Sequence, residues 1–422
     1  MGRRGQADAR DSETVGIDIG IRAVIIGAGA AGISAAATLR EHSPKTETTV
    51  ISKEKRAPYS PVALPDYIEG RIPVDVLSLW NEHSMDTEHT NLVLGKSVAE
   101  IRTNAKGVVL DDGSVVSFDR LLIASGASPI LTGEMQNRRG VFTLRTLEDA
   151  EQIRKQIKER VIVYGAGAVA VKISTALHQM GVDVIMICRS RVLSRLFDED
   201  ICRLIHDTLI GGGIKVVGAH PHMRILGDPV DRFRLGHREF RCDGVIAALG
   251  VAPNTSFLTD KTIRLGRSGG ICVNERMETS ARDIYAAGDC AETKDIISGT
   301  TRLAPLWPLA VEQGRIAALN MCGETAAYEG ALPYNVINVF DVPFVSIGSL
   351  EGERVEIARH GSITRLTVRN GLVVGAQIVG DVKYAALISS SMRKGLKLTE
   401  VNQAGLGPRV PFRPSIGDGR MK

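Results

Sequence analysis

Two glycine-rich runs in this sequence have the residue types and the spacing that hold a pyrophosphate group. The first run, GAGAAG at residues 27–32, follows an apolar segment and opens a segment of small residues. In this pattern the first glycine makes a turn, the second lets the backbone approach the phosphates, and the third lets a helix pack on a strand. The helix N-terminus supplies N–H donors and a positive dipole. We therefore expect a dinucleotide here, held at Gly27, Gly29, Ala31 and Gly32, rather than a glycine turn that serves packing alone.

The second run, GAGAVA at residues 165–170, begins about 138 residues after the first. It ends in alanine, which the pattern tolerates in place of its third glycine. A second dinucleotide is therefore predicted, with contacts at Gly165, Gly167 and Ala170.

Charged residues after each run could recognise the ribose of the bound dinucleotide. Glu54 lies 22 positions beyond Gly32, close to the usual place of the carboxylate that binds ribose hydroxyls. The alternative is a solvated charge among neighbouring basic residues. The second lobe has Arg189 and Arg191 instead, and two guanidiniums can bracket a 2′-phosphate. This favours NADP(H), unless both arginines face solvent and the backbone alone holds NAD(H).

The elements that must position these runs form two similar units. A strand at Arg22–Ile26, a helix through Leu39 and a strand near residues 48–52 predict a βαβ opening. Strands at residues 161–164 and 184–187 repeat this arrangement around the second run, and a closing strand ends at Gly126 in the first unit and at Gly250 in the second. We expect an α/β protein with two Rossmann-like dinucleotide-binding domains.

The order of these segments places the second unit inside the first, followed by a C-terminal α/β domain. The strands FVSIGSL, ITRLTVRN and LVVGAQIVG belong to that last domain. The predicted boundaries are 1–20 for an N-terminal extension, 21–135 with 252–328 for the FAD domain, 136–251 for the NAD(P) domain, 329–405 for an interface domain and 406–422 for a tail.

Composition narrows the class of protein. The formal net charge of the 422 residues is only +4, which argues against a nucleic-acid partner. The six cysteines include no CxxC pair, so neither a disulfide framework nor a metal site is expected. No apolar N-terminal segment and no apolar run of about 18 residues is present, which predicts a cytoplasmic protein without a membrane span.

Five motifs in order, GAGAAG, FDRLLIASGASP, GAGAVA, LGVAPN and IYAAGDCAE, resemble the pyridine nucleotide-disulfide oxidoreductase superfamily. The likeness covers about residues 21–402. It is strongest to the branch of NADH oxidases, coenzyme A-disulfide reductases, ferredoxin reductases and the flavin portion of nitrite reductases. The resemblance implies an enzyme that binds FAD and NAD(P), usually as a dimer.

The resemblance also assigns cofactor contacts. It implies that Asp289 accepts from the ribityl chain of FAD at the head of a helix, although a plain N-cap aspartate is compatible with the same sequence. It places Glu312 and Gln313, in the run at residues 303–315, near the pyrimidine side of the flavin ring, where ordinary first-turn polarity is the alternative. Further contacts are implied at Val98, Ala124, Ser125, Gly126 and Gly288, together with Gly250.

Two departures from the family bear on mechanism. Pro61 and Val62 belong to the loop at residues 57–65 that runs beside the flavin ring, and Val62 stands where related enzymes carry a redox cysteine. Valine cannot form a thiolate, so cysteine chemistry is excluded at this position. Lys172 replaces a glutamate near the nicotinamide. It could stabilise an anionic reduced flavin or relax nicotinamide binding, or it could simply pack its stem and extend its head to water.

These residues predict hydride transfer between nicotinamide and flavin, with single electrons passing to or from a redox protein. One alternative is the FAD subunit of a multi-subunit iron–sulfur 2-oxoacid dehydrogenase of the phenylglyoxylate type, which would reduce NAD(P)+. Another is a non-enzymatic flavin-binding regulatory protein. A homodimer or a subunit of a hetero-oligomer is expected from the family.

Overall fold

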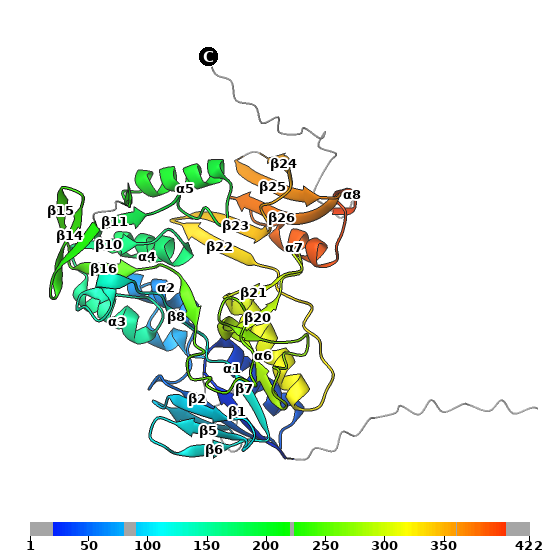
Figure 1. Ribbon diagram of the computed structural model, residues 1–422. Helices are drawn as coiled ribbons and strands as arrows, with labels where there is room; N and C mark the ends of the chain where they lie inside the picture. Colours follow the sequence, from blue (N-terminus) through cyan, green and yellow to red (C-terminus); the bar gives the residue numbers. More distant parts are fainter. Residues whose placement is uncertain (1–19, 80–89, 220–222, 360, 402–422) are drawn as a thin grey trace, which may run out of the picture.

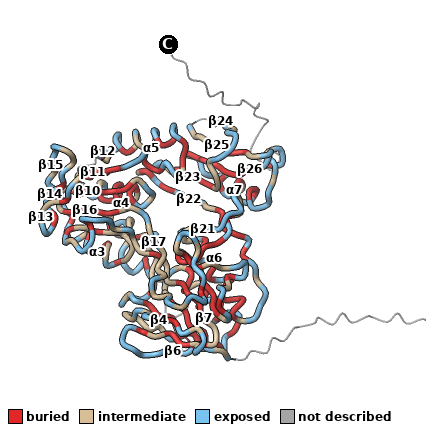
Figure 2. The backbone as a smooth tube through the Cα atoms, viewed as in Figure 1, coloured by how far each residue is buried: buried red, intermediate tan, exposed pale blue. Residues whose placement is uncertain are grey.

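The computed structural model describes residues 20–79, 90–219, 223–359 and 361–401, which form three bodies (Figure 1). The N-terminal extension before residue 20 and the tail at 406–422 lie outside these residues. Among the described helices, none has the length and apolar content needed to cross a membrane. Each body has buried strands at its centre (Figure 2).

The first body is a parallel five-stranded sheet in the order β19-β7-β1-β2-β3, as expected for a dinucleotide fold. Its strands are β1 (Arg22–Ile26), β2 (Glu47–Ser52), β3 (Thr90–Leu94), β7 (Arg120–Ile123) and β19 (Ile284–Ala286). Helices α1 (Ala30–His42) and α6 (Trp307–Met321) pack closely at Gly314. A Cβ at this position would lie only 2.1 Å from the Ala31 carbonyl oxygen, so the approach requires glycine. The first strand is confirmed to the residue, and its helix runs three residues beyond Leu39.

The second body repeats this plan with the strand order β12-β11-β10-β16-β9. Its strands are β9 (Val141–Phe142), β10 (Arg160–Tyr164), β11 (Asp183–Cys188), β12 (Lys215–Gly218) and β16 (Gly244–Ala247), and its helices are α3 (Leu147–Gln156), α4 (Ala168–Gln179) and α5 (Glu199–Gly211). Two antiparallel strands, β8 (Ala127–Pro129) and β17 (Val251–Pro253), connect it to the first body.

The third body is an antiparallel sheet in the order β22-β23-β26-β25-β24 with helix α7 against it (Figure 1). These elements are β22 (Tyr334–Val339), β23 (Val342–Gly348), β24 (Glu353–Arg359), β25 (Ser362–Arg369), β26 (Leu372–Val379) and α7 (Ala385–Arg393). The segment after α7 contains a short helix, α8 (Leu398–Val401).

Smaller elements fill the connections. They are α2 (Leu64–Glu69), three-residue to four-residue 3₁₀ turns η1 (Pro61–Ala63), η2 (Val74–Leu77), η3 (Gly133–Met135) and η4 (Gly288–Cys290), and the strands β4 (Val98–Arg102), β5 (Gly107–Leu110), β6 (Val115–Ser117), β13 (Met223–Gly227), β14 (Val230–Leu235), β15 (Arg238–Arg241), β18 (Ile271–Cys272), β20 (Ala291–Lys294) and β21 (Thr301–Leu303).

Helix α2 joins a different core from the one its sequence position suggests. Its chain segment lies between β2 and β3 of the first sheet, but Leu64 and Ile68 are buried in the core of the second body. They are four residues apart and so face the same side of the helix, toward α3 and α4. The loop at residues 57–65 is therefore anchored on the second body.

Candidate active site

The first glycine run forms the tight turn that the sequence predicts. Gly27 has a positive φ of 109°, and a Cβ there would lie 2.1 Å from the Ala124 carbonyl oxygen. A Cβ on Gly32 would lie 1.9 Å from the Gly27 carbonyl oxygen, so the helix packs directly on the turn. A Cβ on Gly29 would have no atom within 4 Å. This open side, at the N-terminus of α1, is the space that a pyrophosphate requires.

The second run has the same construction. A Cβ on Gly165 would lie 2.2 Å from the Ala248 carbonyl oxygen, whereas one on Gly167 would again meet nothing within 4 Å. Ala170 is fully buried on the first turn of α4, where a small side chain permits close helix packing. The residues at both turns therefore fit the pyrophosphate of a dinucleotide such as FAD or NAD(P).

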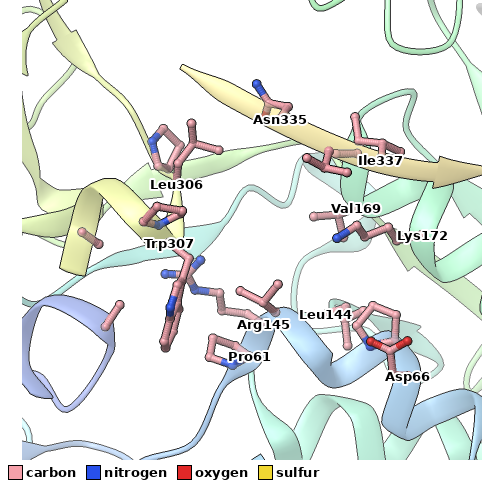
Figure 3. Close-up of a pocket in the computed structure, with 18 of the residues that line it drawn as sticks. Pro61, Asp66, Leu144, Arg145, Val169, Lys172, Leu306, Trp307, Asn335 and Ile337 are labelled. Atoms are coloured by element: carbon pink, nitrogen blue, oxygen red, sulfur yellow. The ribbon is translucent and has the colours of Figure 1, made fainter. Parts of the chain in front are cut away.

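A cavity of about 720 Å³ lies between the two turns and β22. This volume lies within the usual range for ligand pockets, roughly 300–1,000 Å³. It brings together nine of the residues predicted from the sequence. These are Gly29, Ala31, Pro61, Val62, Ala124, Gly126, Lys172, Gly288 and Asp289. Side chains of Leu144, Val169 and Ile337 give it apolar walls (Figure 3).

Asp289 is paired with Arg145, a residue that the sequence analysis missed. Their side chains approach to 2.8 Å, and both line the cavity. Arg145 precedes α3, whose capping box of Thr146 and Asp149 is recognisable in the sequence, but nothing local marks the arginine itself. The expected helix at Asp289 is wrong. Only the short turn η4 begins there, because residues 291–294 pair with β21 as strand β20.

Lys172 is half-buried on the second turn of α4, and its ammonium points into the cavity (Figure 3). Within the described part of the chain the ammonium has neither a hydrogen bond nor an ion pair. The nearby acids of α2 are engaged elsewhere, since Arg71 forms ion pairs with both Asp66 and Glu69. Burial raises the pKa of the Glu69 carboxyl above its ordinary value. An unpaired cation in a cavity is available to interact with a bound ring or its substrate.

Glu54 follows β2, beside the first glycine turn, because the Gly27 N–H donates to the Ile51 carbonyl at 2.8 Å. Its carboxylate accepts a hydrogen bond from the Tyr59 hydroxyl at 2.7 Å. The Glu54 carbonyl accepts from Gly95 N–H, three residues before the predicted contact Val98. Glu54 and Val98 thus lie on one side of the turn, outside the 720 Å³ cavity.

Other predicted contacts serve the framework around the cavity. The Ser125 hydroxyl donates to the Asn254 carbonyl at 2.7 Å, and Gly250 accepts from Ile130 N–H, so both stabilise the two strands that connect the bodies. Gln313 is buried and accepts from Gly288 N–H at 2.8 Å, which fixes the turn carrying Asp289. Glu312 lies 3.9 Å from Arg393 of α7.

Arg189 and Arg191 follow β11 at the edge where the second glycine turn lies. Both are exposed, and Arg191 lies 3.4 Å from Glu199 in a pair that is open to solvent on both sides. Both guanidiniums are therefore accessible to a phosphate at this edge.

No cysteine thiol lines the cavity. Val62, which the resemblance aligns with a redox cysteine, lines the cavity and is 48% exposed. Cys188, Cys202 and Cys242 are buried, and burial raises the pKa of each thiol to about 11. Thiols with such pKa values are poor nucleophiles near neutral pH.

Comparison with known proteins gives concordant results. The model of the pyridine nucleotide-disulphide oxidoreductase family matches residues 21–314. The chain is 32% identical over 403 residues to an NADH oxidase of Methanocaldococcus jannaschii, covering 88% of this chain and 90% of that protein. It is 28% identical to an NADH-rubredoxin oxidoreductase of Clostridium acetobutylicum, covering 87% and 93%. A solved NAD-dependent persulfide reductase from A. fulgidus superposes with a TM-score of 0.84 at 27% identity, covering 94% of this chain and 81% of that one.

Proposed function

Because the chain belongs to the pyridine nucleotide-disulphide oxidoreductase family, we propose that it takes a hydride from NAD(P)H and passes the electrons singly to a redox protein. Family membership makes it an FAD-dependent NAD(P)H oxidoreductase. When bound, FAD accepts a hydride and can release its two electrons one at a time. The observation that carries the proposal is a cavity between two pyrophosphate turns that contains no thiol.

The chain's own residues would bind the two cofactors, orient their rings and exclude water from the space between them. The turn at Gly27–Gly32 would hold the FAD pyrophosphate, and Asp289 with its partner Arg145 would hold the ribityl region. The turn at 165–170 would hold the nicotinamide dinucleotide. Hydride transfer needs close and fixed approach of the two rings, which rigid walls such as Pro61 and Leu144 can provide.

Onward transfer to a protein follows from the missing cysteine. Related enzymes that reduce disulfides or persulfides need a thiolate beside the ring, and Val62 cannot provide one. Two relatives are named for rubredoxin, a redox protein that accepts single electrons. We propose the same class of acceptor for this chain. We also propose that the protein is cytoplasmic, that its domains have the boundaries given above, and that it forms a dimer through the third body.

The test is anaerobic rapid mixing of the purified holoprotein with NADH and, separately, NADPH, followed by oxidised rubredoxin or ferredoxin. We expect the flavin absorbance to bleach within one turnover and to recover on adding the protein acceptor. A protein that contains no FAD, or whose FAD is not reduced by either nucleotide, would contradict the proposal.

We further propose that Arg189 and Arg191 favour NADPH. Replacing both with alanine should raise KM for NADPH about tenfold or more, since each charge-assisted contact to phosphate contributes roughly 1.5–3 kcal/mol. KM for NADH should change little. Arg203→Ala is a matched control, because Arg203 is an exposed arginine that also pairs with Glu199, at 3.6 Å. Equal effects on both nucleotides would contradict this assignment.

A further inference from the structure

A tyrosine outside the cavity joins the predicted ribose ligand to the second body. The Tyr59 hydroxyl donates to the Glu54 carboxylate at 2.7 Å and accepts from the Leu147 backbone N–H at 2.7 Å. Glu54 follows β2 of the first sheet, whereas Leu147 is the first residue of α3. We propose that Tyr59 is a positioning residue that aims Glu54 at the adenosine ribose of FAD and ties this ribose site to the start of α3. The inference rests on the proposed function only in placing FAD at the first glycine turn.

The direction of the two hydrogen bonds is fixed by their chemistry. A backbone N–H can only donate, so the phenol oxygen accepts from Leu147 and its single proton remains for Glu54. Burial, followed by the hydrogen bond to Glu54, raises the pKa of the Tyr59 phenol well above its ordinary value, which keeps that proton in place. The bond occupies Oε2 of Glu54. Among the described residues nothing donates to Oε1, which is left for a ribose hydroxyl.

The same contacts reach the other end of the cofactor site. Asp149, which caps α3, also accepts from the Arg145 backbone N–H at 2.8 Å. The Arg145 side chain in turn holds Asp289 in the cavity. The ribose side of the glycine turn and the ribityl side of the cavity are thus both hydrogen-bonded to the short segment 145–149 at the start of α3.

A second tie holds the same two segments together. Arg56, between Glu54 and Tyr59, donates to both carboxylate oxygens of Glu151 on α3 at 2.8 Å. This pair is half exposed and contributes little alone, roughly 0–1 kcal/mol. Together with the Tyr59 bond it connects residues 54–59 to α3 at two points.

Removing the hydroxyl should weaken FAD binding by acting at the adenosine end. In Tyr59→Phe, Glu54 loses the bond that orients it and the Leu147 N–H loses its acceptor. A hydrogen bond to a charged group contributes enough for roughly a tenfold change in affinity. FMN lacks the adenosine, so its affinity should be the same in wild type and variant.

The experiment compares FAD and FMN binding to apoprotein by quenching of flavin fluorescence. We expect Tyr59→Phe to raise the Kd for FAD about tenfold and to leave the Kd for FMN unchanged. In a Glu54→Gln background, Tyr59→Phe should raise the Kd for FAD little further, because the carboxylate that Tyr59 positions is already absent. Tyr67→Phe is the control. Tyr67 lies on α2, its ring stacks on Arg154 at 4.7 Å, and its hydroxyl has no hydrogen-bond partner in the described residues.

The outcomes separate the two hypotheses. A variant that binds FAD as tightly as wild type, or that loses FAD and FMN equally, would overturn the role of Tyr59. Wild-type apoprotein that takes up no FAD would instead overturn the proposed function. Circular dichroism of both variants checks that each one is folded.

Discussion

Lys172 stands where the resemblance predicts a glutamate near the nicotinamide, and its ammonium has no partner among the described residues. A positive charge beside a flavin stabilises the reduced, anionic ring and raises its reduction potential. The structure places the ammonium in the cavity without engaging it with the acids of α2 (Figure 3). The alternative, in which the stem packs and the head extends to water, predicts that the charge of Lys172 has no effect on the flavin.

Lys172→Glu should therefore lower the midpoint potential of bound FAD by a few tens of millivolts, because a tenfold change in a two-electron equilibrium corresponds to about 30 mV. Lys172→Met should give a smaller shift in the same direction. Redox titration of the holoprotein measures it. Lys155→Glu, at an exposed position on α3, makes the same charge change away from the cavity and serves as the control. An unchanged potential together with unchanged nicotinamide KM would exclude both electrostatic roles of Lys172.

The buried thiols give a prediction with a definite pH direction. Cys188, Cys202 and Cys242 have thiol pKa values near 11 against an ordinary value of 9.0. Their protonated form is favoured in the folded state, so their contribution to stability is complete below pH 9 and is lost as the pH rises toward 11. The melting temperature should therefore fall between about pH 9 and pH 11.

The same buried thiols should react slowly with alkylating reagents. Iodoacetamide near pH 8 should leave flavin reduction by NAD(P)H unaffected. Rapid inactivation at the lower pH would reveal a reactive thiol.

At the scale of elements, local chemistry decided what could be predicted. The turns at Gly27 and Gly165 depend on glycines within one strand-to-helix connection, so the sequence alone located them and β1. The same pattern also predicts the open space beside Gly29. The expected helix at Asp289 was wrong because β20 pairs with β21, and this pairing depends on a separate segment, so no residue type near Asp289 predicts it.

Long-range packing hid the remaining features. The apolar residues Leu64 and Ile68 predict a buried helix face but do not say which core buries it. Arg145 pairs with Asp289 across 144 positions in sequence, and Tyr59 meets Leu147 across 88. Such partners have no sequence spacing rule, in contrast to the fixed offsets of a glycine run or a capping box.

At the scale of the whole molecule, an ion cluster around the buried residues Asp198 and Arg365 joins the second and third bodies. Asp198, at the start of α5, pairs with Arg354 of β24 at 2.7 Å and with Arg365 of β25 at 3.2 Å. Gln377 of β26 both donates to its carboxylate and accepts from its backbone N–H. Arg365 is itself buried and also pairs with Asp200 at 2.6 Å and with Glu356. Three strands of the third body thus converge on one helix start of the second.

Arg365→Met should destabilise the protein by roughly 1–3 kcal/mol, because the buried Asp198 loses one of its two charged partners while it keeps Arg354 and Gln377. Arg369→Met, on the same strand, should cost less than about 1 kcal/mol, because Arg369 is only half-buried and its partner Glu351 is open to solvent. Urea denaturation measures both.

The same cluster gives a prediction at low pH. The Arg365 hydrogen bond lowers the pKa of Asp200 to about 2, so the Arg365–Asp200 pair stabilises the fold above about pH 4, and this stabilisation is lost as the pH falls toward 2. Wild type should lose stability over that interval more steeply than Arg365→Met. FAD content should stay the same in both, since the first glycine turn lies in the separate core of the first body. A variant as stable as wild type would show that apolar packing alone joins the two bodies.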